Sequence, residues 1–256
     1  MSTLRAGLCF DADALRNARF AAQLTSVDVV LFPELMDGGY RSLAEGKSPH
    51  HLADPLISSL RNLSKQTQCT IIAGSLFLGE GTLRPTNTSL VFHRGRIIHR
   101  YDKIHLFKPA GDTKFFGPGK LDTSTFRIST RHGRLHAGVV ICYDLRFPEL
   151  IRALALNGLQ ILFVPARWPK VRDDAWQALL KARAIENQMF IVGCNACDTE
   201  GGYSYAFDPL GRLIFSSRTA KGKALHTFSL DISRLDSSRR LHNNLTDAVF
   251  LKARLR

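Results

Sequence analysis

The stretch VVICYDLRFPEL, from Val139 to Leu150, changes character at Cys142. The β-branched residues before Cys142 favour a buried strand, and Pro148 suits the first turn of a following helix. A strand that leads directly into a helix is the repeating unit of α/β proteins. The cysteine at this junction is either a small hydrophobe that extends the strand or a side chain held at the mouth of a cleft by rigid elements on both sides.

The same alternation of strands and helices continues outward in both directions. Short apolar runs predict strands at 4–10, 28–32, 70–77, 159–166, 189–195 and 223–232, and helical spacing predicts helices at 14–22, 55–65, 148–157 and 173–187. Three further segments, 89–101, 121–142 and 203–217, are predicted hairpins, with turns at Arg94-Gly95, His132-Gly133 and 208–211. Some strands alternate with helices and others pair as hairpins. Together they imply mixed sheets with helices packed outside, a layered α/β architecture.

The composition is ordinary for a globular protein. Of 256 residues, 45% are hydrophobic and 9% aromatic, and no apolar run approaches the roughly 18 residues that a membrane span needs. No linker or repeat divides the chain, so we expect a single domain over residues 1–256. The N-terminus lacks the pattern of a secretory signal, and we expect a cytoplasmic protein that does not bind membranes.

The chain has five cysteines, a small and odd number that argues against a disulfide framework. The absence of such a framework fits a reducing compartment. Cys194 and Cys197 form a C-x-x-C pair, but no second pair completes a set of four zinc ligands. Chance spacing is the favoured interpretation. The Gly38-Gly39 and Gly201-Gly202 pairs have no phosphate-loop context, so we expect no metal, nucleotide or other cofactor.

The chain is basic, with 35 Lys and Arg against 22 Asp and Glu and a net charge of +13. This charge attracts anions and would permit nonspecific contact with nucleic acid. The basic residues are scattered, however, and no nucleic-acid motif organises them. A solvated basic surface is the favoured interpretation, and nucleic acid is not the expected partner.

Three polar residues follow predicted strands: Glu34, Lys103 and Cys142. Ligands of layered α/β sheets bind beyond the carboxyl ends of strands, so these residues are candidates to converge at one site. Each residue alone is ordinary, because such a Glu or Lys is usually solvated and a lone Cys is usually buried packing.

Together the three residues supply what acyl transfer requires. Cys142 offers a nucleophile, and Glu34 a base that takes its proton and later passes it to leaving ammonia. Lys103 and the backbone N–H of Tyr143 are candidates to stabilise an oxyanion. The set predicts a hydrolase of amides or nitriles, whereas His105 and Asp144 are expected to be structural hydrogen-bonding residues.

Four longer segments carry a family resemblance: LFPELM, YDKIHLF, GVVICYDLRFPEL and WQALLKARAIENQMFIVGCN. They resemble the nitrilase superfamily of carbon–nitrogen hydrolases, in the right order, from residue 4 to residue 230. The resemblance implies a four-layer α-β-β-α sandwich, commonly a homodimer, with Glu34, Lys103 and Cys142 as the catalytic residues.

One departure from the family pattern lies in HLFKPAGDTKFFGPG. Many members carry a second glutamate there, which touches the catalytic lysine, and the closest alignment puts Asp112 at that place. Aspartate is shorter by one methylene, about 1.5 Å of reach. If the loop lies closer to compensate, Asp112 still pairs with Lys103; if it does not, activity or substrate range differs from that of relatives.

Within the superfamily, CYDLRFPEL and VPARWPKVRDDAW look most like the ω-amidase branch, which hydrolyses the side amide of 2-oxoglutaramate or 2-oxosuccinamate through a thioester. These substrates are anionic. The expected substrate-binding residues comprise the Tyr143 backbone, the arginines that border the cleft and two aromatic walls: Tyr143, Arg146, Arg167, Arg172, Phe116 and Trp168. Arg172 is favoured for the carboxylate, although Arg146 and Arg172 have structural interpretations as well.

Two alternatives remain open. One is an enzyme for another substrate, such as a nitrile, a different small amide or an N-carbamoyl compound. The other is a noncatalytic relative that binds anions or nucleic acid, which the net charge and Asp112 favour and the presence of Glu34, Lys103 and Cys142 disfavours.

Overall fold

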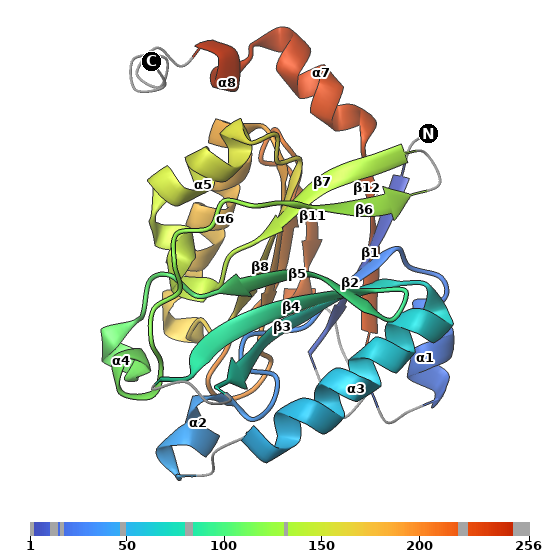
Figure 1. Cartoon of the computed structure of the whole chain (residues 1–256). Helices are drawn as coiled ribbons and strands as arrows, with labels where there is room; N and C mark the ends of the chain where they lie inside the picture. The colour runs from blue at the N-terminus through green and yellow to red at the C-terminus, as the bar shows by residue number, and fades with distance from the viewer. Residues whose placement is uncertain are drawn as a thin grey trace.

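The computed structural model describes residues 3–10, 15, 18–46, 50–79, 84–130, 133–219 and 225–247. Within these ranges the chain forms two six-stranded sheets that pack face to face, with helices on the outer side of each sheet (Figure 1). This is the layered α/β architecture that the sequence pattern predicts and the four-layer α-β-β-α sandwich that the family resemblance implies.

The first sheet has the strand order β12-β1-β2-β3-β4-β5. Its parallel centre pairs β1 with β2 and β2 with β3, and the flanking strands pair antiparallel. Its strands are β1 (Thr3–Cys9), β2 (Val29–Leu31), β3 (Thr70–Leu78), β4 (Thr86–His93), β5 (Arg96–Asp102) and β12 (Leu225–Asp231).

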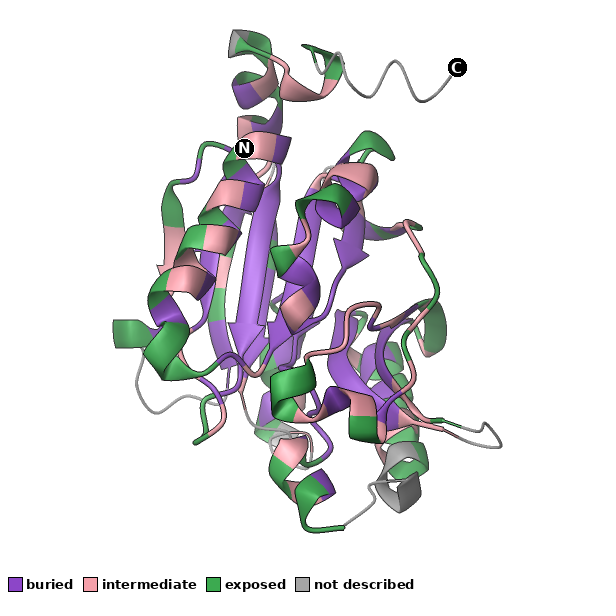
Figure 2. Ribbon diagram, turned by 90° about the vertical axis from the view of Figure 1, so that its left-hand side faces the viewer, coloured by how far each residue is buried: buried purple, intermediate pink, exposed green. Residues whose placement is uncertain are grey.

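The second sheet repeats this plan in the order β11-β10-β9-β8-β7-β6, with β7, β8 and β9 parallel. Its strands are β6 (Phe126–Thr130), β7 (Gly133–Val139), β8 (Ile161–Ala166), β9 (Phe190–Asn195), β10 (Tyr205–Phe207) and β11 (Leu213–Ser216). Every residue of β8 and β9 is buried, as expected of central strands that are covered on both faces (Figure 2).

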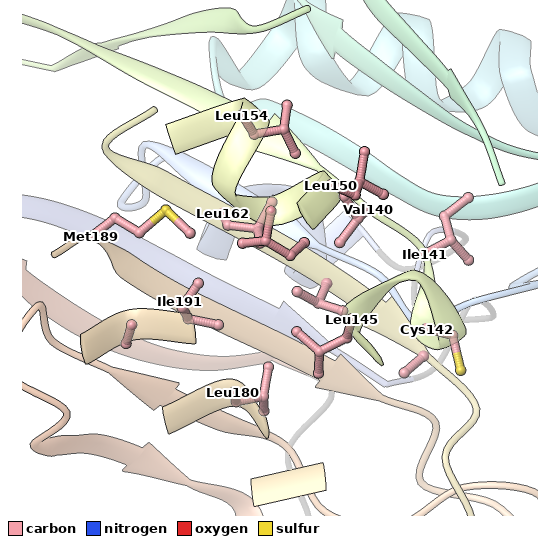
Figure 3. Packing of buried hydrophobic residues seen from close by; sticks show 14 of the residues in the cluster. Val140, Ile141, Cys142, Leu145, Leu150, Leu154, Leu162, Leu180, Met189 and Ile191 are labelled. Carbon is pink, nitrogen blue, oxygen red and sulfur yellow. The ribbon is translucent and has the colours of Figure 1, made fainter. Parts of the chain in front are cut away.

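Three apolar layers hold the sandwich together. Helices α1 (Ala18–Leu24) and α3 (His50–Thr67) cover the first sheet, and α5 (Pro148–Leu156) and α6 (Asp173–Asn187) cover the second. Between the sheets, residues such as Leu8, Val29, Phe163 and Val192 form the middle layer. Under α5 and α6, the packed side chains reach as far as Cys142, so the candidate nucleophile is anchored in a rigid core (Figure 3).

Several helices were not predicted: α2 (Gly39–Ala44), α4 (Asp112–Phe115), α7 (Ser233–Leu241) and α8 (Asn244–Asp247). Three of them span at most six residues and are too short to show a helical period, and α7 is strongly polar. Helix α3 begins before its predicted start and contains Pro55, which removes only one backbone donor near the start of the helix. Residues 14 and 132, which belong to a predicted helix and a predicted turn, lie outside the described ranges.

Among the described residues no helix is both long and apolar enough to cross a membrane. All five cysteines are free. Cys194 is fully buried, its Sγ lies 3.5 Å from the carbonyl oxygen of Leu31, and Cys197 is exposed. In the described part of the chain, no group of three or more His, Cys, Asp or Glu side chains is placed to hold a metal ion.

Candidate active site

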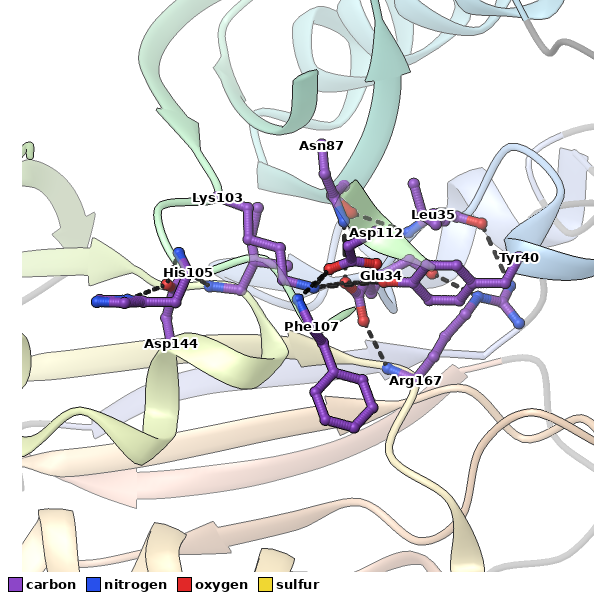
Figure 4. Close-up of polar contacts among 12 residues, drawn as sticks. Glu34, Leu35, Tyr40, Asn87, Lys103, His105, Phe107, Asp112, Asp144 and Arg167 are labelled. Atoms are coloured by element: carbon purple, nitrogen blue, oxygen red, sulfur yellow. Dashed lines mark hydrogen bonds and ion pairs between the residues drawn. The ribbon is translucent and has the colours of Figure 1, made fainter. Parts of the chain in front are cut away.

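Glu34, Lys103 and Cys142 meet at one end of the sandwich (Figure 4 shows the first two). They follow β2, β5 and β7, so three strands from both sheets deliver them to the same place. Lys103 Nζ donates to Glu34 Oε1 at 2.8 Å, and the thiol of Cys142 lies close enough to the Glu34 carboxylate that each group shifts the pKa of the other. The exposed fractions are 0% for Glu34, 1% for Lys103 and 8% for Cys142.

The loop that carries Glu34 is held against β3. The Leu35 N–H donates to Ser75 Oγ at 2.9 Å, and Leu35 itself has a left-handed φ of 47°. A side chain at Gly74 would come within 2.1 Å of the carbonyl oxygens of Phe32 and Pro33. Only glycine therefore lets this loop lie so close to the strand.

Cys142 occupies a sharp turn at the start of a short 3-10 helix (Cys142–Arg146), with a φ of 47°. Such a conformation is strained for a non-glycine residue and persists only where neighbours hold it. Asp144 supplies that support, because its buried carboxylate accepts from Tyr101 Oη at 2.8 Å, from the His105 N–H at 2.8 Å and from the Ile141 N–H at 3.2 Å. His105 also bonds Asp144 through its ring, so both residues have the structural roles predicted for them.

Asp112 reaches Lys103 despite its short side chain. Its Oδ2 accepts from Lys103 Nζ at 2.7 Å and from the Phe107 N–H at 2.8 Å. The chain makes a tight 3-10 turn at Lys108–Ala110 and then a left-handed turn at Gly111, which brings Asp112 close. Of the two outcomes left open by the sequence, the structure has the one in which the loop compensates.

Two further residues bind Glu34 and were not singled out from the sequence. Tyr40 Oη donates to Glu34 Oε1 at 3.0 Å and accepts from Lys103 Nζ at 3.3 Å. Asn87 Nδ2 donates to the same carboxylate oxygen at 2.9 Å. A buried asparagine inside strand β4 is unusual, since asparagine is depleted in strands, and this was the available signal.

The charges of the site keep Glu34 ionised. Burial by itself would raise the pKa of Glu34, but the charge of Lys103, hydrogen bonds from Lys103 and Tyr40, and the neighbouring Cys142 thiol hold it below its ordinary value. For Lys103, burial acts to lower the pKa, and the negative groups around it, with Glu34 first, raise it well above the usual range. The site therefore holds a carboxylate beside an ammonium.

The thiol of Cys142 is different. Burial and the charge of Glu34 raise its pKa well above the ordinary value, and Lys103 and the backbone N–H of Arg167 only partly oppose this. At neutral pH the sulfur beside Glu34 is therefore protonated. A thiol in this state would act as a nucleophile only if a base took its proton, and Glu34 is the carboxylate beside it.

A small, partly open pocket lies over Cys142. Its lining combines aromatic rings with three arginines: Phe107, Cys142, Tyr143, Arg146, Arg167, Trp168, Pro169 and Arg172. The Arg146 guanidinium lies 4.8 Å from the centre of the Trp168 ring, and that of Arg172 lies 5.9 Å from the centre of the Phe107 ring. Four residues predicted to bind substrate, Tyr143, Arg146, Trp168 and Arg172, thus line one cavity.

The prediction for Phe116 as a cleft wall is wrong. Phe116 is fully buried in a small cluster with Leu35, Leu43 and Phe77 and is not among the residues that line the pocket. Phe107 lines the pocket in its place.

Arg167 borders the pocket as expected, but its guanidinium is already engaged. Its Nη1 lies 2.5 Å from Asp198 Oδ2 and 2.9 Å from Glu200 Oε2, and its Nε donates to the carbonyl oxygen of Glu34 at 2.8 Å. With these partners the side chain is not free to hold a substrate carboxylate, which corrects the expectation from the sequence. Its backbone N–H, however, donates to Glu34 Oε2 at 3.0 Å.

A buried carboxylate, a fixed ammonium and a thiol at the floor of an aromatic, basic pocket are the groups needed to transfer an acyl group from nitrogen to sulfur and on to water. The structure resembles a carbon–nitrogen hydrolase of Helicobacter pylori, with a TM-score of 0.81 and 21% identity over 97% of this chain and 96% of that one. That likeness shows the fold.

The sequence comparisons place the chain in a family. The family model described as carbon-nitrogen hydrolase matches residues 12–240. The chain is 37% identical over 220 residues to a Staphylococcus lugdunensis protein named hydrolase in agr operon, covering 83% of this chain and 91% of that protein. It is 32% identical over 218 residues to a Bacillus subtilis protein named 2-oxoglutaramate amidase, covering 82% of each. The chain therefore belongs to the carbon–nitrogen hydrolase family of the nitrilase superfamily, is most like the ω-amidase branch, and is a hydrolase of carbon–nitrogen bonds.

Proposed function

We propose that the protein is an ω-amidase that hydrolyses the side amide of a small 2-oxo dicarboxylic acid monoamide, 2-oxoglutaramate or 2-oxosuccinamate, to the acid and ammonia. The observation that carries the proposal is the pocket itself, in which the exposed arginines Arg146 and Arg172 border the entrance while Cys142 forms the floor. A substrate with a carboxylate at one end and an amide at the other matches that arrangement. The similarity to the Bacillus subtilis 2-oxoglutaramate amidase supports it.

In the first step Glu34 takes the proton of Cys142 as the sulfur attacks the amide carbon. The thiol and the carboxylate are neighbours in the buried site, so the proton passes directly from one to the other. Attack converts the carbonyl oxygen to an oxyanion, for which Lys103 Nζ and the backbone N–H of Tyr143 are the proposed donors. Glu34 then protonates the amide nitrogen, the carbon–nitrogen bond breaks, and ammonia leaves behind a thioester.

In the second step water hydrolyses the thioester. Glu34, again a carboxylate, accepts a proton from water as its oxygen attacks the thioester carbon. The carbon–sulfur bond breaks, the sulfur of Cys142 recovers its proton from Glu34, and the dicarboxylic acid leaves. One water is consumed and one ammonia released per cycle, and the site returns to its starting state.

The remaining polar groups hold Glu34 in place through both steps. Tyr40, Asn87 and Lys103 all donate to its Oε1, and the Arg167 N–H donates to its Oε2. Asp112 fixes Lys103 from the opposite side. A carboxylate held by this many donors has little freedom to rotate, so the oxygen that accepts the proton stays directed at the reacting atoms.

For the substrate carboxylate, Arg172 is the proposed partner. Its guanidinium is exposed and stacks on Phe107 at the pocket rim, and a planar guanidinium binds a carboxylate with two parallel hydrogen bonds. Arg146 lies on the other aromatic wall, over Trp168, and is the second available cation.

The experiment is to measure ammonia and the dicarboxylic acid released from both oxo-acid amides by the wild type, by Cys142→Ala and by Cys197→Ala. Cys197 is exposed, so its variant serves as the matched control. We expect release by the wild type and Cys197→Ala and none by Cys142→Ala. Turnover of the corresponding nitrile or of an N-carbamoyl compound in place of these amides would overturn the substrate assignment, and unchanged turnover in Cys142→Ala would overturn the mechanism.

A further inference from the structure

The loop after β9 contacts α2, the helix that follows the loop carrying Glu34. Glu200, in this loop, lies 160 residues along the chain from Tyr40, yet its Oε2 accepts from the Tyr40 N–H at 3.1 Å and its Oε1 from the Arg41 N–H at 2.6 Å. These are among the first backbone donors of α2, which have no acceptor inside the helix. A single carboxylate thus fixes the start of the helix from which the Tyr40 hydroxyl reaches Glu34.

Arg167 joins Glu200 to the backbone of Glu34. Its guanidinium donates to Glu200 Oε2 at 2.9 Å, to the Glu34 carbonyl oxygen at 2.8 Å and to the Leu35 carbonyl oxygen at 3.2 Å. The side chain is only 8% exposed, so these bonds are shielded from water. Arg167 therefore holds the two peptide groups on either side of the left-handed turn at Leu35.

Gly39 permits this close packing. A Cβ at Gly39 would lie 2.6 Å from Glu200 Oε2 and 2.8 Å from the central carbon of the Arg167 guanidinium, and its φ is 71°. Both the approach and the conformation require glycine. The contact between the two loops is thus built into the backbone as well as into the side chains.

We propose that Glu200 is a positioning residue for Glu34, acting through Tyr40 and through Arg167. Glu200 is not among the residues that line the pocket, so it acts on the base and not on bound substrate. The inference rests on the proposed role of Glu34 as the base.

The charged and titratable groups that face Glu34 come from several elements. They are Lys103 after β5, Tyr40 on α2, Cys142 after β7 and Arg167 after β8, with Asp112 behind Lys103. Asp37 lies near Arg167 on the same loop as Glu34, and burial raises its pKa to about 6. Because Asp37 is present in every variant below, differences among their pH profiles do not come from removing it.

The test compares Glu200→Gln with Glu45→Gln, a matched change on the exposed Arg41–Glu45 pair of α2. In Glu200→Gln an amide N–H replaces one acceptor, so α2 and Tyr40 lose their fixed position. On 2-oxoglutaramate we expect kcat to fall by roughly tenfold with KM within about twofold of the wild type, since misplacing a catalytic group by a fraction of an ångström costs rate without loss of substrate contacts. Glu45→Gln should match the wild type.

The pH profile separates positioning from a simple change of charge. Removing a nearby negative charge would by itself lower the pKa of Glu34, whereas losing the Tyr40 hydrogen bond raises it. We expect the acid limb of kcat/KM to move to higher pH in Glu200→Gln. An acid limb that stays in place or moves to lower pH would overturn the proposal.

A double-variant cycle tests the route through Tyr40. In a Tyr40→Phe background the hydroxyl is already absent, so most of the effect of Glu200→Gln on kcat should disappear. Full additivity of the two variants, or a loss of thermal stability in Glu200→Gln with unchanged kcat and pH profile, would show a merely structural role.

One readout does not depend on the substrate. The rate at which iodoacetamide alkylates Cys142, followed by peptide mass spectrometry to exclude Cys197, reports the transfer of the thiol proton to Glu34. We expect alkylation at pH 7 to slow severalfold in Glu200→Gln and to be unchanged in Glu45→Gln. If the oxo-acid amides are not hydrolysed at all, the substrate proposal fails while this measurement still decides the role of Glu200; equal alkylation rates in the two variants would refute that role.

Discussion

Asp112 accepts a hydrogen bond from Lys103 Nζ at 2.7 Å, although the family resemblance leads one to expect a glutamate at this place. The shorter side chain succeeds because its loop is drawn in, with the Phe107 N–H bonded to the same carboxylate oxygen at 2.8 Å. The lysine is thus held between two carboxylates, Glu34 on one side and Asp112 on the other.

This geometry predicts that Asp112→Glu does not improve the enzyme. Asp112 is fully buried and its oxygen already lies at bonding distance, so an added methylene has no space. We expect the free energy of unfolding in urea to fall by about 1–3 kcal/mol and kcat to fall as Lys103 is displaced. A Glu variant with wild-type stability and higher kcat would show that the loop has not adapted to aspartate.

Because Asp37 is buried, we expect its ionisation to make the free energy of unfolding depend on pH. Burial raises its pKa from 3.8 to about 6, so between these values the folded protein binds more protons than the unfolded chain. The contribution of this group to the free energy of unfolding therefore falls as pH rises through that window. Replacement by Asn keeps an acceptor for the Phe77 N–H and removes the ionisation.

The measurement is urea unfolding of wild type and Asp37→Asn at pH 5 and pH 7.5. We expect the variant to gain about 1 kcal/mol relative to wild type between the two pH values. A difference between the two proteins that does not change with pH would contradict the assignment.

Removal of the Arg172 side chain should selectively weaken the binding of anionic substrates. In Arg172→Ala we expect KM for 2-oxoglutaramate to rise by about tenfold or more, because a charge-assisted hydrogen bond contributes roughly 1.5–3 kcal/mol. Turnover of an uncharged amide of the same length should change little. Arg127→Ala, on the exposed face of edge strand β6, is the matched control. If Arg146→Ala has the larger effect, the carboxylate binds on the Trp168 wall instead.

Substitution of Phe116 should mainly affect stability, whereas substitution of Phe107 should mainly affect substrate binding. Phe116 is fully buried against Phe77, with ring centres 5.3 Å apart, so Phe116→Ala should lower the free energy of unfolding by about 3–5 kcal/mol. Phe107 is half-buried and lines the pocket, so Phe107→Ala should mainly raise KM. Steady-state kinetics and urea unfolding on both variants check this, and a raised KM with normal stability in Phe116→Ala would restore the original prediction for that residue.

The sequence by itself determined the layers of this protein and the strand ends that carry Glu34, Lys103 and Cys142. Apolar runs and helical spacing depend on local burial, which repeats along the chain and is visible in one dimension. A polar residue that closes such a run marks the edge of a sheet in the same way. For the same reason, the structural roles of His105 and Asp144 could be predicted from their own segments.

Only the tertiary structure decided which further side chains reach Glu34 and which face the pocket. Tyr40, Asn87 and Glu200 come from a short helix, a strand interior and a distant loop, and nothing in their local sequence indicates that they meet. Phe107 lines the pocket while Phe116 is buried in the core, although both belong to the same segment of the sequence. Contacts of this kind are set by how the two sheets and their loops pack in three dimensions, which sequence periodicity does not encode.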